Sequence, residues 1–233
     1  DGKTDLAIAA WDAKNGKLVW CTPRDQEVLR TFSFCTPLVI ENQGRTEIVS
    51  PGSGMVGAYS PQDGTLLWKV SYGEGYSVVP RPVFADDMLY VLSGFNRPSM
   101  LAIKVDGSTG DLTDSHVQWR AIKAMPKTPS PIAVDGLVYA IDDTGSLSCL
   151  DAISGELLWK EKLIGNFSAS PVLAGDTLYC CTEDGVCYVL KVSSAGAEII
   201  WETDLEERIL ASPAVVDEAI YIRSDPHLWK IGS

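Results

Sequence analysis

Tryptophan recurs at a nearly regular interval in this chain, and this recurrence limits the possible folds more than any other feature. The intervals are 48, 51, 40 and 42 residues, measured between Trp20, Trp68, Trp119, Trp159 and Trp201. Five prolines, usually preceded by serine, keep step with them at Pro37, Pro82, Pro131, Pro171 and Pro213. A tyrosine has the same period at Tyr90, Tyr139, Tyr179 and Tyr221. Three series with one period indicate an array of structural repeats.

Residues 128–159 show what one repeat contains. The short apolar runs "SPIAV", "LVYAI", "SLSCL" and "ELLW" are typical of strands, and the turns "DG", "DDTG" and "DAISG" separate them. No segment shows the 3.6-residue periodicity of an amphipathic helix. Four short antiparallel strands per repeat, in tandem, predict an all-β fold, namely a β-propeller of four-stranded blades. A β-sandwich would not place the same Trp and Pro once in every four strands.

The repeats define the expected domain organisation. We expect a single β-propeller domain over residues 1–233, with a partial first unit and a partial last unit. The units cover approximately residues 1–20, 32–68, 77–119, 128–159, 167–201 and 209–233. In a five-bladed ring, strand 17–21 would complete the last unit, and this closure would remove a free sheet edge. Residues 5–11 would then be left over. In the alternative, the chain is part of a seven- or eight-bladed propeller.

Each repeat ends in a phrase that has a physical explanation. In "AWDAKNGKLVW", the Asp carboxylate can accept a hydrogen bond from a backbone N–H two residues on, and the Gly can adopt a positive φ. The Trp is large and mostly apolar, which suits a strand that packs on the next blade. The predicted docking residues are Trp20, Trp68, Trp119, Trp159, Trp201, Gly16, Gly64, Gly155, Asp12 and Asp151.

The same phrase resembles the signature of the PQQ-like propeller repeat, A-x-D-x-x-x-G-x-x-x-W. It matches at Ala10, Asp12, Gly16 and Trp20, and it is slightly altered in "AYSPQDGTLLW" and "CLDAISGELLW". The segment "SGFNRPSMLAIKVDGSTGDLTDSHVQWR" is similar to PQQ-like repeat proteins common in planctomycetes, which are related in repeat to the outer-membrane assembly lipoprotein. The resemblance implies a periplasmic or exported protein, although the first residues contain no signal-peptide pattern.

Charge and hydropathy exclude several classes of partner. The chain has 19 Lys and Arg against 31 Asp and Glu, a formal net charge of −12, which disfavours nucleic acid and anionic membranes. No apolar stretch is long enough for a membrane span. We therefore expect a protein partner or a small polar ligand.

The resemblance also implies an alternative, because quinoprotein alcohol dehydrogenases of this repeat class hold PQQ and Ca²⁺ in the central funnel. No spacing of acidic residues indicates a calcium cage. His116 and His227 complete neither a zinc site nor a Ser-His-acid triad. We predict no catalytic residue, no metal ligand and no cofactor, and PQQ with calcium is the alternative.

The cysteines allow two interpretations. The quinoproteins often carry a disulfide between adjacent cysteines, but Cys180 and Cys181 occupy successive positions of a predicted strand and so face opposite sides of the sheet. Cys181 and Cys187 lie symmetrically about the "TEDG" turn, so either a cross-strand disulfide or free thiols are compatible with the sequence.

The candidate binding residues lie where the "SP" dipeptides would face the funnel. They are Ser130, Ser170 and Ser212, with Arg81 taking the place of the serine in one repeat. Arg81 either pairs with a neighbouring carboxylate or binds an anionic or polar ligand. The insertion 95–118 is either a solvated hairpin extension or a loop that binds a partner. The sequence therefore favours a non-catalytic binding or scaffold module of the bacterial cell envelope over an oxidoreductase.

Overall fold

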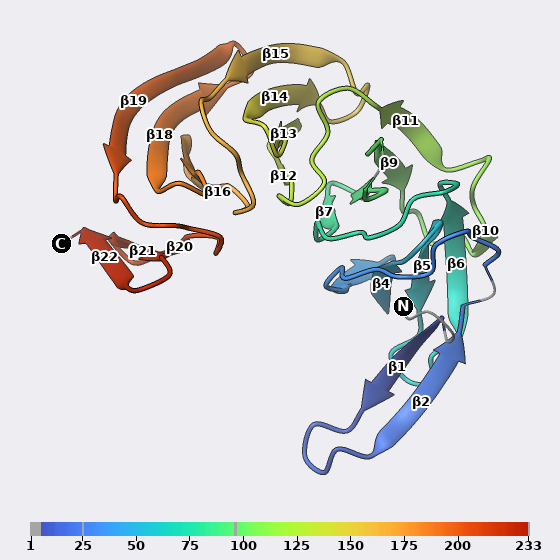
Figure 1. Ribbon diagram of the computed structural model, residues 1–233. Coiled ribbons are helices and arrows are strands. Elements are labelled where there is room, and N and C mark those ends of the chain that lie inside the picture. The colour runs from blue at the N-terminus through green and yellow to red at the C-terminus, as the bar shows by residue number, and fades with distance from the viewer. Residues whose placement is uncertain (1–5, 25, 96, 233) are drawn as a thin grey trace. The chain divides into compact units, whose positions relative to one another are not determined.

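The computed structural model describes residues 6–24, 26–95 and 97–232 and has two compact units, residues 1–123 and 124–233. The regular structure in the described residues is β-strand, as Figure 1 shows. These residues include no helix that is long and apolar enough to cross a membrane. The predicted all-β propeller fold class is confirmed by the series of antiparallel sheets. That residues 1–233 form one propeller domain stays a prediction.

The first unit contains a hairpin and two larger sheets. Its strands are β1 (Ala7–Trp11), β2 (Leu18–Pro23), β3 (Leu38–Asn42), β4 (Arg45–Pro51), β5 (Met55–Tyr59), β6 (Leu66–Ser71), β7 (Val83–Ala85), β8 (Met88–Leu92), β9 (Met100–Lys104), β10 (Gly110–Asp111) and β11 (Val117–Ala121). Strands β3–β6 form one sheet and β7, β8, β9 and β11 another, each antiparallel in chain order. Residues 7–11, which a five-bladed closure would leave over, form β1 and pair with β2.

The second unit contains three sheets that repeat one pattern. Its strands are β12 (Ile132–Val134), β13 (Leu137–Ile141), β14 (Ser146–Asp151), β15 (Leu157–Lys162), β16 (Val172–Ala174), β17 (Thr177–Cys181), β18 (Val186–Ser193), β19 (Gly196–Asp204), β20 (Ala214–Val216), β21 (Ala219–Arg223) and β22 (Leu228–Gly232). The sheets are β12–β15, β16–β19 and β20–β22. Asp135 and Gly136 have φ angles of 49° and 74°, so the predicted "DG" hairpin is a two-residue turn with both φ positive.

The recurring prolines stand at the entrance to the first strand of each sheet. Pro37, Pro82, Pro131, Pro171 and Pro213 come directly before β3, β7, β12, β16 and β20. Proline has no backbone N–H to donate and its φ is fixed, so this position starts a strand without interrupting its ladder. Four of these first strands have three residues, which is shorter than the sequence runs suggest.

Each recurring tryptophan lies opposite a small or β-branched residue of the neighbouring strand. The pairs are Ala10–Trp20, Ala58–Trp68, Ala102–Trp119, Cys149–Trp159 and Val189–Trp201. In each pair the register shifts beside the tryptophan, so the residue before it is the extra residue of a β-bulge. Because directly opposite side chains share one face of the sheet, the small partner leaves room for the indole.

The core of the first unit encloses a carboxylate. Glu47 is fully buried, and its Oε2 accepts a hydrogen bond from Trp68 Nε1 at 2.7 Å. Its Oε1 accepts from Asn42 Nδ2 at 2.9 Å and from Arg45 Nε at 2.7 Å. Asn42 Oδ1 in turn accepts from the backbone N–H of Gly107 at 2.8 Å. Through Gly107, this network ties the segment between β9 and β11 to the sheet β3–β6, and it satisfies the buried charge.

The substitution Glu47→Ala tests this network. We expect it to lower the free energy of unfolding by about 3–5 kcal/mol, because it leaves the buried donors of Trp68 and Asn42 without their acceptor and removes the partner of the partly exposed Arg45. Denaturant unfolding measures the loss. The matched control is Glu41→Ala on the same hairpin, where Glu41 is exposed and accepts a hydrogen bond from Thr46, and its expected loss is below about 1 kcal/mol. Equal losses in the two variants would contradict the network.

Candidate functional site

The predicted docking residue Trp20 lies against the next sheet of its unit. Its indole is 8% exposed, and Nε1 donates to the carbonyl of Pro61 at 3.0 Å, in the turn between β5 and β6. Thr22 Oγ1 donates to the carbonyl of Gly64 at 2.6 Å. A Cβ atom at Gly64 would lie 2.4 Å from Trp20 Cε3. Gly64 therefore allows the close approach of the indole, and its φ of 73° is one that glycine adopts readily.

The other four tryptophans have different surroundings. Trp159 Nε1 donates to the carbonyl of Ser193 at 2.7 Å, in the hairpin between β18 and β19. Trp68 is 1% exposed and donates to Glu47, while Gly110 of β10 pairs with it in a parallel register. Trp119 packs on the ring of Tyr90 at 5.8 Å, and Trp201 is 53% exposed. A docking role for all five stays a prediction, which these contacts support at Trp20 and Trp159.

The Asp residues of the phrase hold its turn. Asp12 Oδ1 accepts from the backbone N–H of Lys14 at 2.7 Å, and Asp151 Oδ1 accepts from that of Ser154 at 2.7 Å. Gly16 and Gly155 have φ angles of 70° and 71°, and each donates its N–H to the carbonyl of the preceding Asp of its phrase. In these two turns, the Asp carboxylate accepts the expected backbone hydrogen bond, and the Gly adopts the expected positive φ.

The three serine candidates are connected across successive sheets of the second unit. The backbone N–H of Ser130 donates to Ser170 Oγ at 2.9 Å, and that of Ser170 donates to Ser212 Oγ at 3.0 Å. Two of the three hydroxyl oxygens therefore accept hydrogen bonds from the neighbouring repeat. This contact is a structural role that the sequence did not indicate, and a ligand-binding role for these serines stays a prediction.

Arg81 belongs to the first unit and is exposed. Its charge and that of Arg24 act on the Cys35 thiol and favour the thiolate, but burial dominates and raises the Cys35 pKa to about 12. Arg81 therefore lies near a partly buried thiol, in the loop that precedes β7. Its role as an anion or polar-ligand contact stays a prediction.

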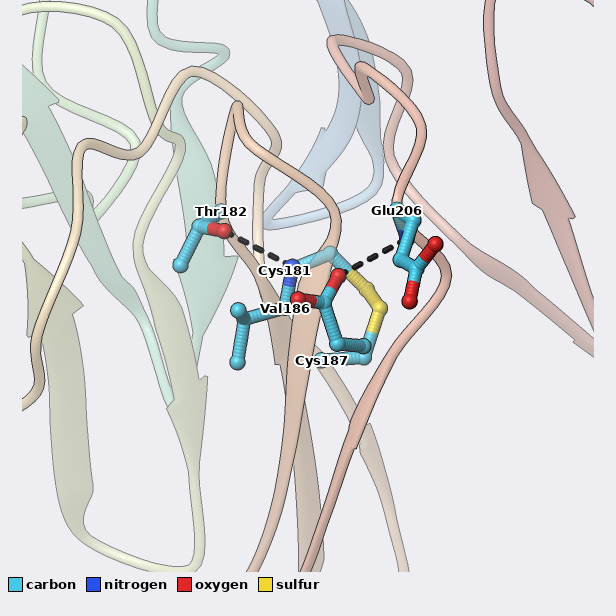
Figure 2. The surroundings of a disulfide bond; sticks show 6 residues. Cys181, Thr182, Val186, Cys187 and Glu206 are labelled. Carbon is cyan, nitrogen blue, oxygen red and sulfur yellow. Dashed lines mark hydrogen bonds between the residues drawn. A yellow bond between two sulfur atoms is a disulfide. The ribbon is translucent and has the colours of Figure 1, made fainter.

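Cys181 and Cys187 are joined by a disulfide, which resolves the alternative left open by the sequence (Figure 2). The two residues are directly opposite on β17 and β18, with their Cα atoms 4.1 Å apart. The backbone N–H of Val186 donates to Thr182 Oγ1 at 3.0 Å within the enclosed turn. Cys180 is a free, buried thiol, and burial raises its pKa to about 12. The adjacent cysteines thus behave as ordinary strand residues.

A cavity of about 400 Å³ lies beside this disulfide, between the sheets β16–β19 and β20–β22. Its walls include Cys181, Cys187, Trp201, Ile222 and Ile231. No three side chains of His, Cys, Asp or Glu among the described residues gather closely enough to hold a metal ion.

The sequence did not predict a cluster of aromatic residues in the loops of the first unit. Phe32, Phe34, Tyr76 and Phe95, with Arg30, form a cluster in the loops of the first unit, which we call the aromatic platform. Phe95 is the first residue of the predicted insertion 95–118, and Asn96 lies outside the described residues. The signal available in the sequence was the concentration of aromatic residues in loops rather than strands.

Comparison with known proteins identifies relatives of this chain. A family model described as outer membrane protein assembly factor BamB matches residues 3–116 and 110–197. BamB of Legionella pneumophila (strain Paris) is 28% identical over 200 residues, which cover 83% of this chain and 47% of that protein. BamB of Yersinia pestis is 25% identical over 233 residues, covering 92% and 53%. The chain thus spans about half the length of these curated relatives.

Solved structures show the same fold. The crystal structure of BamB from Moraxella catarrhalis has a TM-score of 0.50 at 14% identity and covers 97% of this chain and 80% of that chain. The computationally designed Ika8 protein has a TM-score of 0.71 at 13% identity, covering 97% and 66%. The resemblance to the PQQ-like repeat and to the outer-membrane assembly propeller is confirmed by the family match.

Two glycines in the same position of the phrase test the tryptophan contact. Gly64→Ala places a Cβ against Trp20, whereas a Cβ at Gly16 meets nothing within 4 Å, and both positions have a positive φ. We expect Gly16→Ala to lower the free energy of unfolding by about 1 kcal/mol, from the backbone conformation alone. Gly64→Ala should cost about 1–3 kcal/mol more, because of the clash. Denaturant unfolding gives both values, and equal losses would argue against the docking contact.

Alkylation followed by mass spectrometry tests the disulfide. Unfolded but unreduced protein should be modified at the four free cysteines and at neither Cys181 nor Cys187, and reduction should expose both. In the folded protein, exposed Cys21 should react before buried Cys180, whose raised pKa disfavours the thiolate. Replacing both disulfide cysteines by serine should lower the free energy of unfolding by about 2 kcal/mol. Modification of Cys181 without a reductant would show that the bond is not formed.

Proposed function

Because this chain belongs to the family of the outer membrane protein assembly factor BamB, we propose that it is a non-catalytic β-propeller module that binds protein partners in the bacterial cell envelope. The observation that carries this proposal is the family match, which extends over most of the repeats. The relatives' names place them in outer-membrane protein assembly, and we propose the same process for this chain. The alternative, a PQQ- and calcium-dependent dehydrogenase, is not favoured by these relatives.

We propose a periplasmic or otherwise exported location. The Cys181–Cys187 disulfide supports it, because disulfides form and persist in oxidising compartments and are rare in the cytosol. The net charge of −12 supports protein rather than nucleic acid or an anionic membrane as the partner. We expect no cofactor, and a small polar ligand is the alternative to a protein partner.

Deleting the gene in its own bacterium tests the proposal. We expect less assembled outer-membrane protein in the mutant, because a binding module of the assembly process is lost. Quantitative mass spectrometry of the outer-membrane fraction measures it. Returning the unaltered gene should restore the amount.

The purified protein provides the complementary test. With PQQ and Ca²⁺ added, we expect neither binding by calorimetry nor dye-linked oxidation of alcohols. Calcium-dependent PQQ binding with turnover, together with a normal outer-membrane fraction in the deletion strain, would replace the proposal by the oxidoreductase.

A further inference from the structure

The backbone beneath the aromatic platform is held by hydrogen bonds between three loop segments. Ser77 N–H donates to the carbonyl of Phe32 at 2.8 Å, and Phe34 N–H donates to that of Val78 at 2.8 Å. Phe95 N–H donates to the carbonyl of Tyr76 at 2.8 Å. Residues 32–34, 76–78 and 94–95 therefore lie side by side outside the main sheets. A surface whose backbone is already fixed loses little conformational freedom when a partner binds.

The close packing of these segments depends on Gly94. A Cβ atom there would lie 2.3 Å from the carbonyl oxygen of Tyr76 and 3.0 Å from the Cα of Val78. Its φ of 86° also favours glycine. The turn after β8 is thus shaped to bring Phe95 against Tyr76.

The side chains above this backbone are four aromatic rings, of which two, Phe34 and Phe95, are exposed. The ring centroids of Phe32 and Tyr76 are 5.5 Å apart, those of Tyr76 and Phe95 are 5.9 Å apart, and those of Phe32 and Phe34 are 5.9 Å apart. Phe34 is 65% exposed and Phe95 is 48% exposed, whereas Tyr76 is buried between them and 8% exposed. Exposed apolar side chains gathered in one patch are characteristic of an interaction surface.

An arginine is fixed on the same platform. The Arg30 guanidinium lies 4.6 Å from the centroid of the Tyr76 ring, and its Nη1 donates to Tyr76 Oη at 2.8 Å. The loop segments 30–36, 75–82 and 93–98 contain three arginines, Arg30, Arg81 and Arg97, and neither Asp nor Glu, and the exposed Glu74 directly precedes the second segment. In a chain with a net charge of −12, these segments are a local exception of positive charge.

We propose that the aromatic platform binds an acidic segment of a partner protein that also carries aromatic or aliphatic side chains. The proposal rests on the proposed function, for which it names a binding surface and the chemistry of the partner. Aromatic residues and arginine are enriched at protein interfaces and supply much of their binding energy. The planar guanidinium pairs with carboxylates through two parallel hydrogen bonds.

A protein segment fits these observations better than an anionic lipid surface. The rings form a patch in a defined arrangement, which offers separate positions for individual side chains. The overall negative charge of the chain opposes its approach to an anionic membrane. Arg30, which lies on the platform, can still pair with a carboxylate of a protein segment. Binding to anionic vesicles is therefore the competing outcome of the test.

Panning a random library of phage-displayed short peptides on the purified chain tests the proposal. We expect the enriched peptides to be acidic and to carry aromatic or aliphatic residues. Binding of one enriched peptide, synthesised with a fluorophore, is then measured by anisotropy at several salt concentrations. The double substitution Phe34→Ser with Phe95→Ser should lower the affinity for this peptide at least about tenfold. Arg30→Gln with Arg97→Gln should also weaken it and reduce the salt dependence.

The matched control removes two exposed apolar side chains elsewhere. Ile153 and Ile164 of the second unit are 80% and 82% exposed, and replacing both by serine should leave the affinity unchanged. Thermal unfolding of all variants separates lost binding from lost folding. Enrichment of neutral or basic peptides, or equal binding by the platform variant and the native chain, would overturn the proposal.

Vesicles of phosphatidylglycerol provide the second arm of the test. If co-sedimentation with the vesicles depends on Phe34 and Phe95, and the binding of no enriched peptide depends on them, the platform is a membrane contact and the proposal is overturned. Failure of the platform proposal and failure of the proposed function can be told apart. A chain that binds the acidic peptides while its deletion leaves the outer-membrane fraction unchanged would keep the platform and reject the role in assembly.

Discussion

The pairing of each of the five recurring tryptophans with a small or β-branched residue on the preceding strand of its sheet is the constraint on which the repeat depends. An indole needs space on its face of the sheet, and Ala, Cys or Val directly opposite provides it at all five positions. The bulge before the tryptophan then increases the local twist and redirects the outer strand. At Trp20 the indole lies against Gly64 of the following sheet, where any larger residue would clash. Trp20 therefore depends on two small residues, Ala10 on its own sheet and Gly64 in the phrase of the next repeat.

Much of the fold was predictable because this contact recurs. A single Trp would have been ambiguous, but five at one period, with Pro and Tyr in step, indicated four-stranded repeats. The turns were also predictable, since Asp135-Gly136 and the Asp12 and Asp151 turns follow local rules that involve neighbouring residues in the chain. The strand lengths were less predictable, because pairing partners decide where a ladder ends.

The features that sequence reasoning missed depend on residues far apart in the chain. Glu47 looks like any charged residue in a hairpin, and its burial follows from Trp68 and from Gly107 through Asn42. The aromatic platform joins three loops, and none of its four rings lies in a periodic strand pattern. The disulfide was an open alternative, because strand symmetry about a turn gives proximity and not bond formation. The serine contacts were missed for the same reason, as each crosses from one repeat to the next.

The segment that connects the last two strands of a repeat, of which the second carries the recurring tryptophan, varies widely in length. Between β1 and β2 it is closed by the short Asp12 turn, whereas between β9 and β11 it contains residues 105–116, which include β10. Both hairpins return to the same pairing of tryptophan with alanine. In the second case the added residues pair in parallel with β6 and cover part of its edge. This hairpin is therefore a natural grafting point, where evolution or an engineer can add a recognition loop while the register of the blade is preserved.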